Sequence, residues 1–185
     1  IRIMALTSQQ EAMKNALASR LAAFVHPVWI EDDEHNAQQV GSCALLKITG
    51  MVFLLTAAHV LDENEGETLF LVTAAGPVIV EGTKHTSKSR TGDPQHRDDP
   101  YDVGVICFAP VVASAVSLLP TLCLNQCDSL ARPMPGSLYF ACGYPWTKNR
   151  KVDGRRAKVP RRPFAYFTKI HSKEVYEAQI GRAHV

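Results

Sequence analysis

The sequence predicts an all-β fold with one short helix at the N-terminus. Residues 51–55 form a short, continuously apolar run, which is typical of a buried strand. A second strand-like segment, residues 41–48, precedes this run, and only Thr49-Gly50 separates the two, so we expect a β-hairpin. Further short runs of this kind recur along the chain between turn residues, which favours a sheet.

The N-terminal segment, residues 1–24, holds the predicted helix. Residues 8–24 are rich in helix-forming residues, and apolar side chains repeat at helical spacing at Met13, Leu17, Leu21 and Phe24. We expect a short amphipathic helix that packs on the outside of the domain. The alternative is a helix on a membrane surface, but its basic face is thin.

The first half of the predicted sheet consists of five strand-like runs, at residues 25–30, 41–48, 51–55, 68–73 and 77–80. Residues 81–100 are then polar and rich in turn residues. This stretch contains His85 and His96. Histidines are common metal ligands, but we interpret these two as side chains of a long surface loop.

The second half of the chain has a weaker pattern. Residues 111–134 show no period-2 alternation and contain Pro120 and Pro133, so we expect a connection without regular strands. Strand-like runs then resume at residues 138–142, 164–170 and 174–179.

A histidine stands at the end of the most apolar run. Residues 51–55 are followed by Thr56-Ala57-Ala58, and we expect His59 at the strand's end, held by the core on one side and open on the other. An imidazole gains and loses a proton near neutral pH, so this position suits a catalytic general base. The alternative is a core histidine without a catalytic role.

An aspartate follows 43 positions later and opens the strand-like run 103–108. A buried carboxylate is costly unless it is paired, so Asp102 needs a partner. If the partner is His59, the carboxylate accepts the Nδ1–H of the imidazole at about 2.7–3.0 Å and fixes its tautomer. The alternative is a turn residue at the edge of a strand.

Both segments resemble known elements. Thr56-Ala57-Ala58-His59 and Asp102-Val103-Gly104-Val105 are similar to the Thr-Ala-Ala-His and Asp-Val/Ile-Ala-hydrophobe elements of trypsin-like (chymotrypsin-fold) serine peptidases of the bacterial type, with Gly104 where alanine is usual. Residues 138–145 look like the strand and Gly-Tyr/Phe-Pro turn that open the second barrel of many members. The resemblance implies a chymotrypsin-like double β-barrel and a Ser-His-Asp triad, with His59 as base and Asp102 as orienting acid. The implied activity is that of a serine endopeptidase acting on a peptide or protein substrate.

The resemblance also sets the expected domain organisation. The first β-barrel occupies residues 25–112 and carries His59 and Asp102, residues 113–137 connect the barrels, and residues 138–179 start a second barrel that is cut off. Residues 180–185, Ile-Gly-Arg-Ala-His-Val, match the translation of a common sequencing-adapter sequence, so we expect a non-native tail there.

The family's nucleophile is not found in the sequence. It lies in Gly-x-Ser-Gly-Gly, whose glycines let backbone N–H groups point at the developing oxyanion. No such motif occurs in residues 1–185, and Ser137 and Ser172 lack its glycines. Cys142 raises a cysteine-peptidase variant, but it follows Asp102 too closely. We therefore expect a C-terminally truncated fragment that is inactive by itself and whose serine lies beyond residue 185.

Composition narrows the remaining classes. The 185 residues contain no apolar stretch of eighteen, so we expect no transmembrane helix and no membrane partner. No signal-peptide pattern is visible, and five cysteines at scattered spacing do not suggest a disulfide framework, which favours a cytoplasmic protein. Cys123 and Cys127 lack a second Cys/His pair, so we expect neither a metal nor a cofactor.

Two other functional classes stay open. One is a non-catalytic trypsin-like binding module. The other is a nucleic-acid binder, because residues 143–185 hold eleven basic and three acidic residues, whereas residues 1–142 hold nine basic and fifteen acidic. The basic residues gather in the loop 148–162, but only Trp146 is near enough to stack on bases, so we prefer a solvated loop.

Overall fold

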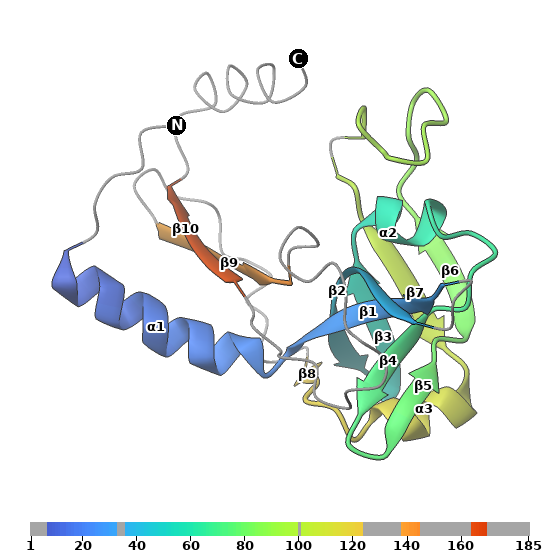
Figure 1. The fold of residues 1–185 in the computed structure, drawn as a ribbon, viewed down its shortest axis with the longest axis horizontal. Helices are drawn as coiled ribbons and strands as arrows, with labels where there is room; N and C mark the ends of the chain where they lie inside the picture. Colours follow the sequence, from blue (N-terminus) through green and yellow to red (C-terminus); the bar gives the residue numbers. More distant parts are fainter. Residues whose placement is uncertain (1–6, 33–35, 100, 124–137, 145–163, 170–185) are drawn as a thin grey trace.

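The computed structural model describes residues 7–32, 36–99, 101–123, 138–144 and 164–169 (Figure 1). The fold is mostly β, as predicted. Seven strands form one curled antiparallel sheet, half of a barrel, in the order β5-β4-β1-β2-β3-β7-β6. These strands are β1 (Val25–Glu31), β2 (Ala37–Ile48), β3 (Met51–Thr56), β4 (Phe70–Thr73), β5 (Gly76–Ile79), β6 (Gly82–Thr86) and β7 (Gly104–Phe108).

Among the described residues, the remaining elements are three helices and three strands. The helices are α1 (Ser8–Ala22), α2 (Ala58–Asp62) and α3 (Pro110–Val116), and the strands are β8 (Leu122–Cys123), β9 (Leu138–Gly143) and β10 (Phe164–Lys169). β8 pairs in parallel with β2, and β9 pairs antiparallel with β10. In the part of the chain that the structure describes, no helix combines the length and the apolar character needed to cross a membrane.

The predicted hairpin is confirmed. β2 and β3 pair antiparallel as far as Ile48 and Met51, which leaves Thr49-Gly50 as a two-residue loop. Both loop residues have positive φ, at 47° and 88°. Type I′ turns require this combination, and their twist matches that of the flanking strands. β2 begins at Ala37, earlier than predicted, because its polar first residues pair with β1.

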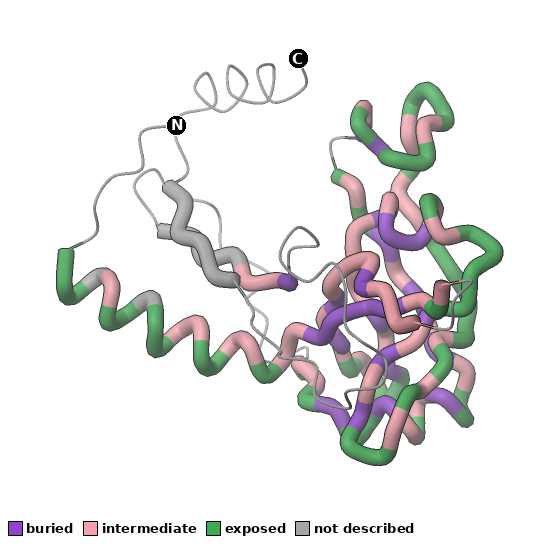
Figure 2. Tube along the Cα trace, viewed as in Figure 1, coloured by how far each residue is buried: buried purple, intermediate pink, exposed green. Residues whose placement is uncertain are grey.

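Buried residues gather in the curled sheet and in the two helices α2 and α3 (Figure 2). β3 contributes Val52 and Leu54 to this core, whereas Met51 is 52% exposed. The burial of residues 51–55 therefore alternates along the strand. We had expected a buried strand, but only one face of β3 is buried. Leu61 of α2 and Val116 of α3 are both part of the same core.

Two elements differ from the sequence-based expectation. The stretch 81–100 is not only loop, because β6 lies within it and pairs antiparallel with β7. β6 is polar and almost wholly exposed, so it lacks the apolar alternation by which a strand is recognised. The stretch 111–134 begins with α3, whose Pro110 occupies a helix start, where proline is well tolerated. Residues 124–137 lie outside the described residues.

The predicted N-terminal helix is confirmed as α1, which ends at Ala22. Met13 is 53% exposed, and Leu17 and Leu21 are partly buried. The helix therefore lies on the outside of the molecule, where it contacts β9 and β10 (Figure 1).

Of the expected second barrel, the structure describes β9, β10 and Tyr144. Tyr144 joins the end of β9 to β2, since Gln39 Nε2 donates to its carbonyl oxygen at 2.7 Å and its own N–H donates to Ser42 Oγ at 2.6 Å. The predicted strand 174–179, the basic loop 148–162 and the predicted tail 180–185 lie outside the described residues.

Candidate active site

His59 lies in α2, and not at the end of a strand as the sequence suggested. α2 begins at Ala58, shortly after β3 ends at Thr56. Three of its residues, Ala58, Val60 and Leu61, are buried. Because neighbouring residues of a helix face different directions, the same turn that anchors these three leaves the side chain of His59 38% exposed.

Asp102 satisfies the N-terminus of α2 from a distant part of the chain. The N-cap residue, Ala57, makes no side-chain capping bond. Instead, the Ala58 N–H donates to the backbone oxygen of Asp102 at 3.1 Å, and the His59 N–H donates to Asp102 Oδ1 at 3.0 Å. The first N–H groups of a helix have no partner inside it, so these two bonds replace a local cap. They fix α2 against the segment that leads into β7.

Asp102 reaches this position through a left-handed backbone conformation, with φ at 44°. Positive φ is uncommon outside glycine, and aspartate is among the residues that adopt it most readily. Two residues later, Gly104 begins β7 and pairs with Thr56, the last residue of β3. The end of β3 and the start of β7 are therefore neighbours, and this brings α2 and Asp102 together.

The two residues singled out from the sequence are in contact. His59 Nδ1 lies 2.7 Å from Asp102 Oδ2, within the range expected for an oriented base. A carboxylate only accepts hydrogen bonds, so Nδ1 donates, and Nε2 keeps the lone pair in the neutral ring. The arrangement is chemically a base whose tautomer is fixed by an acid, with a partly exposed ring.

Glycines allow α2 to lie close to the sheet. A Cβ atom on Gly104 would stand 2.9 Å from Leu61 Cδ1 and 3.0 Å from the backbone oxygen of Ala57. A Cβ atom on Gly41 of β2 would stand 2.7 Å from Val60 Cγ2. These distances are shorter than ordinary van der Waals contact. Glycine at position 104 therefore permits this close approach of α2 to β7.

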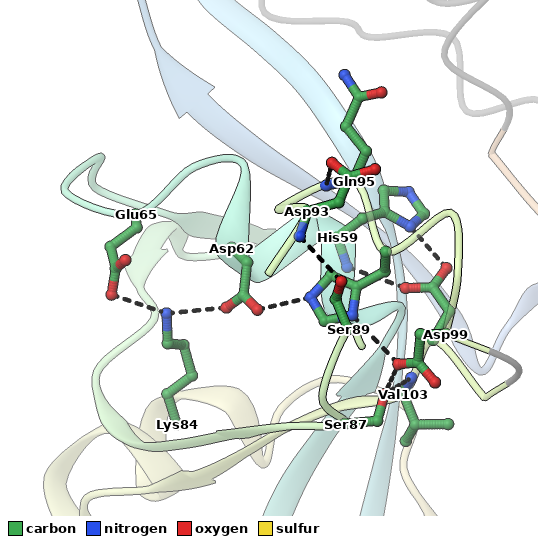
Figure 3. Close-up of polar contacts among 12 residues, drawn as sticks. His59, Asp62, Glu65, Lys84, Ser87, Ser89, Asp93, Gln95, Asp99 and Val103 are labelled. Atoms are coloured by element: carbon green, nitrogen blue, oxygen red, sulfur yellow. Dashed lines mark hydrogen bonds and ion pairs between the residues drawn. The ribbon is translucent and has the colours of Figure 1, made fainter. Parts of the chain in front are cut away.

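A buried histidine lies next to the pair, and its predicted place in a surface loop is wrong. His96 is 5% exposed, so it is not a surface-loop side chain. Its Nε2 lies 2.7 Å from Asp62 Oδ2, and its Nδ1 lies 3.1 Å from Asp99 Oδ2. On the far side of Asp62, Lys84 Nζ lies 3.1 Å from Asp62 Oδ1 and 3.2 Å from Glu65 Oε1 (Figure 3).

The acids around His96 favour its charged form. Burial lowers the pKa of His96, but hydrogen bonds to Asp62 and Asp99 and the charges of Asp62 and Asp102 outweigh burial and leave that pKa raised. The pKa of Asp99 is lowered to about 2, first of all by the hydrogen bond that Ser87 donates to it. Asp99 is therefore a carboxylate at neutral pH, and it favours the protonated form of His96.

An open hollow of about 460 Å³ lies beside this network, lined by α2, β6 and the loop after β6. Its walls carry both Lys84 and Lys88 and the acids Asp62, Glu65 and Asp93, whereas His59 and Asp102 do not line it. Within the described ranges, no three His, Cys, Asp or Glu side chains have the arrangement of a metal site.

No family model matches this sequence, and a search of curated proteins finds no match either. The residues of the site and their geometry therefore carry the functional argument alone.

Proposed function

We propose that this chain carries the general base and the orienting acid of a trypsin-like serine endopeptidase, with a chymotrypsin-like barrel around them. The observation that supports the proposal most strongly is that one carboxylate, that of Asp102, accepts both the backbone N–H and the Nδ1–H of His59. The side chain and the helix that bears it are thereby oriented by the same group. A curled antiparallel sheet around the pair is compatible with a barrel of that family.

The proposed chemistry uses the lone pair on Nε2 of the His59 ring. Nε2 of His59 takes the proton of a serine hydroxyl as that oxygen attacks a peptide carbonyl, and it then returns the proton to the leaving amine. Asp102 stabilises the imidazolium that forms in between. Among the described residues, no serine hydroxyl is hydrogen-bonded to His59. We place the nucleophile in a segment that follows residue 185.

Cys142 is a poorer candidate for the nucleophile. Burial raises the pKa of its thiol. A reactive cysteine needs the thiolate, which a lowered pKa provides, so the environment of Cys142 acts in the opposite direction. The serine mechanism is therefore the one that we propose.

The second candidate is a binding module that keeps the fold without catalysis. One observation favours it: among the described residues, no hydroxyl group is hydrogen-bonded to His59. The two candidates differ in one requirement: catalysis needs a serine within reach of His59 Nε2, together with backbone N–H groups that stabilise the oxyanion. The presence or absence of such a serine decides between them.

The test uses the natural reading frame that continues from this chain. We expect its product to be labelled by a fluorophosphonate, which reacts with activated serines, and to hydrolyse a mixed peptide library. His59→Ala should abolish labelling, because the serine loses its base. His85→Ala, at an exposed histidine of β6, is the matched control and should be labelled like the wild type. A product that folds but is never labelled would instead indicate the binding module.

A further inference from the structure

His96 is the only described side chain that connects the helix bearing His59 to the segment bearing Asp102 through hydrogen bonds at both ends of its ring. Both ring nitrogens face carboxylate oxygens, which only accept hydrogen bonds. A neutral imidazole has one N–H and satisfies only one of them. The geometry by itself therefore requires the imidazolium, in which both nitrogens donate.

The first end of this link is Asp62, the last residue of α2, three residues after His59. The link thus fixes the C-terminal end of α2, while Asp102 fixes the N-terminal end. Held at both ends, a helix of five residues has little freedom to shift. Such a short helix would not be stable alone in water.

The second end of the link is Asp99, which organises the chain on both sides of Asp102. Asp99 Oδ1 accepts the N–H of Tyr101 at 2.9 Å, and Asp99 Oδ2 accepts the hydroxyl of Ser87. Ser87 in turn exchanges two hydrogen bonds with Val103: its hydroxyl accepts the Val103 N–H at 2.8 Å, and its own N–H donates to the Val103 oxygen at 2.8 Å. The residues immediately before and after Asp102 are therefore both fixed through Asp99.

We propose that His96 is a positioning residue, a buried imidazolium that holds the His59–Asp102 pair in place by joining α2 to the segment before β7. A catalytic role of the His59–Asp102 pair rests on the proposed function. The joint, by which we mean the contacts of His96 with Asp62 and Asp99, does not depend on it. His96 does not act on a substrate, and its effect passes through Asp62 and Asp99. The left-handed backbone of both His96 and Asp102, with φ at 52° and 44°, is the kind of strained conformation that surrounding contacts must maintain.

The joint has a built-in pH dependence. The charged groups that face His96 are Asp62 of α2, with Lys84 of β6 behind it, and Asp99 and Asp102 of the segment before β7. When His96 loses its proton, one ring nitrogen ceases to donate, and one of the two carboxylates loses its partner. The joint then opens at one end, and the His59–Asp102 pair loosens as pH rises through the titration of His96.

The experiment follows two backbone amides that donate to Asp102, those of Ala58 and His59. Their hydrogen-exchange protection factors, which correct for the intrinsic effect of pH, are measured by NMR together with the ¹⁵N shifts of the His96 ring. We expect His96 to carry protons on both nitrogens at pH 6.5, and the two amides to lose about tenfold or more in protection as His96 titrates. Amides of the β2–β3 hairpin should keep theirs.

His96→Gln should cause the same local loss of protection at every pH, with His85→Gln as the matched control that changes nothing. If His96→Gln does not fold, the titration of the wild type decides alone. A His96 ring with one bare nitrogen at pH 6.5 would overturn the proposal, and so would Ala58 and His59 amides whose protection ignores the titration. Because the readout is amide exchange and not hydrolysis, failure of the peptidase proposal leaves this result unaffected.

Discussion

The substitution Gly104→Ala tests the packing that places His59. The Cβ of an alanine at this position would meet Leu61 Cδ1 at 2.9 Å, the Ala57 oxygen at 3.0 Å and Leu61 Cγ at 3.2 Å. Leu61 is 2% exposed and has no room to swing away. α2 must therefore move away from β7 by several tenths of an ångström.

The cost of this movement is set by two opposing terms. Overpacking a close contact typically destabilises a protein by about 1–3 kcal/mol. Replacing glycine by alanine where the backbone allows it stabilises by about 0.4–1 kcal/mol, because the unfolded chain loses freedom. We therefore expect Gly104→Ala to lower the free energy of unfolding by about 1–2 kcal/mol. The amides of Ala58 and His59 should also lose protection, because Ala57 is the N-cap of α2.

The assay is urea unfolding followed by circular dichroism, with equal m-values as the condition for comparing midpoints. Gly143→Ala is the matched control, because the nearest atom to its Cβ would be Ser42 Oγ at 3.5 Å, an ordinary contact. We expect this variant to be as stable as the wild type or slightly more so. A Gly104→Ala variant that is equally stable or stabilised would show that α2 does not lie against β7 as described.

Four further predictions concern the core, the charged network and the activity of the chain. Leu71→Ala, at a side chain that is 0% exposed, should lower the free energy of unfolding by about 2–5 kcal/mol in the same urea assay. Asp99, whose pKa falls from 3.8 to about 2 on folding, contributes stability that is present above pH 3.8 and lost as pH falls toward 2; Asp99→Asn should flatten this acid limb of the stability profile. His96, whose folded pKa is raised above 6.5, contributes stability that is complete below pH 6.5 and lost as pH rises through the folded pKa; His96→Gln should flatten that limb, and an unchanged slope would contradict the assignment. The purified chain of 185 residues should not hydrolyse peptide or ester substrates, and turnover that a serine-directed inhibitor blocks would reveal a nucleophile within it.

The sequence predicts the hairpin and the two residues of the pair, for physical reasons that can be stated. Thr49-Gly50 is a turn signal that acts locally, so it is visible without tertiary structure. His59 and Asp102 stand out because each lies beside an apolar run, and the strands next to them, β3 and β7, pair with one another. A polar residue next to an apolar segment can be recognised from the amino-acid sequence alone.

The features that the sequence analysis missed depend on contacts between distant segments. α2 has no capping residue of its own, because Asp102 caps it from 43 positions away. β6 is polar, and it forms a strand because its backbone pairs with the edge of β7. His96 lies in a polar stretch, and its burial follows from two carboxylates that neutralise it. The only available signal was the spacing, since its acids Asp62 and Asp99 lie three residues from His59 and from Asp102 respectively.

The ¹⁵N chemical shifts of the His59 ring test the central claim most directly, because they report which nitrogen carries the proton. With Asp102 accepting from Nδ1, the account predicts that the neutral ring is protonated at Nδ1 and bare at Nε2. In Asp102→Asn the amide NH₂ can face Nδ1, and we expect the tautomer to reverse, which places the proton on Nε2 and removes the base. A wild-type ring protonated at Nε2, or a tautomer that the substitution leaves unchanged, would contradict the assignment of His59 as a base oriented by Asp102.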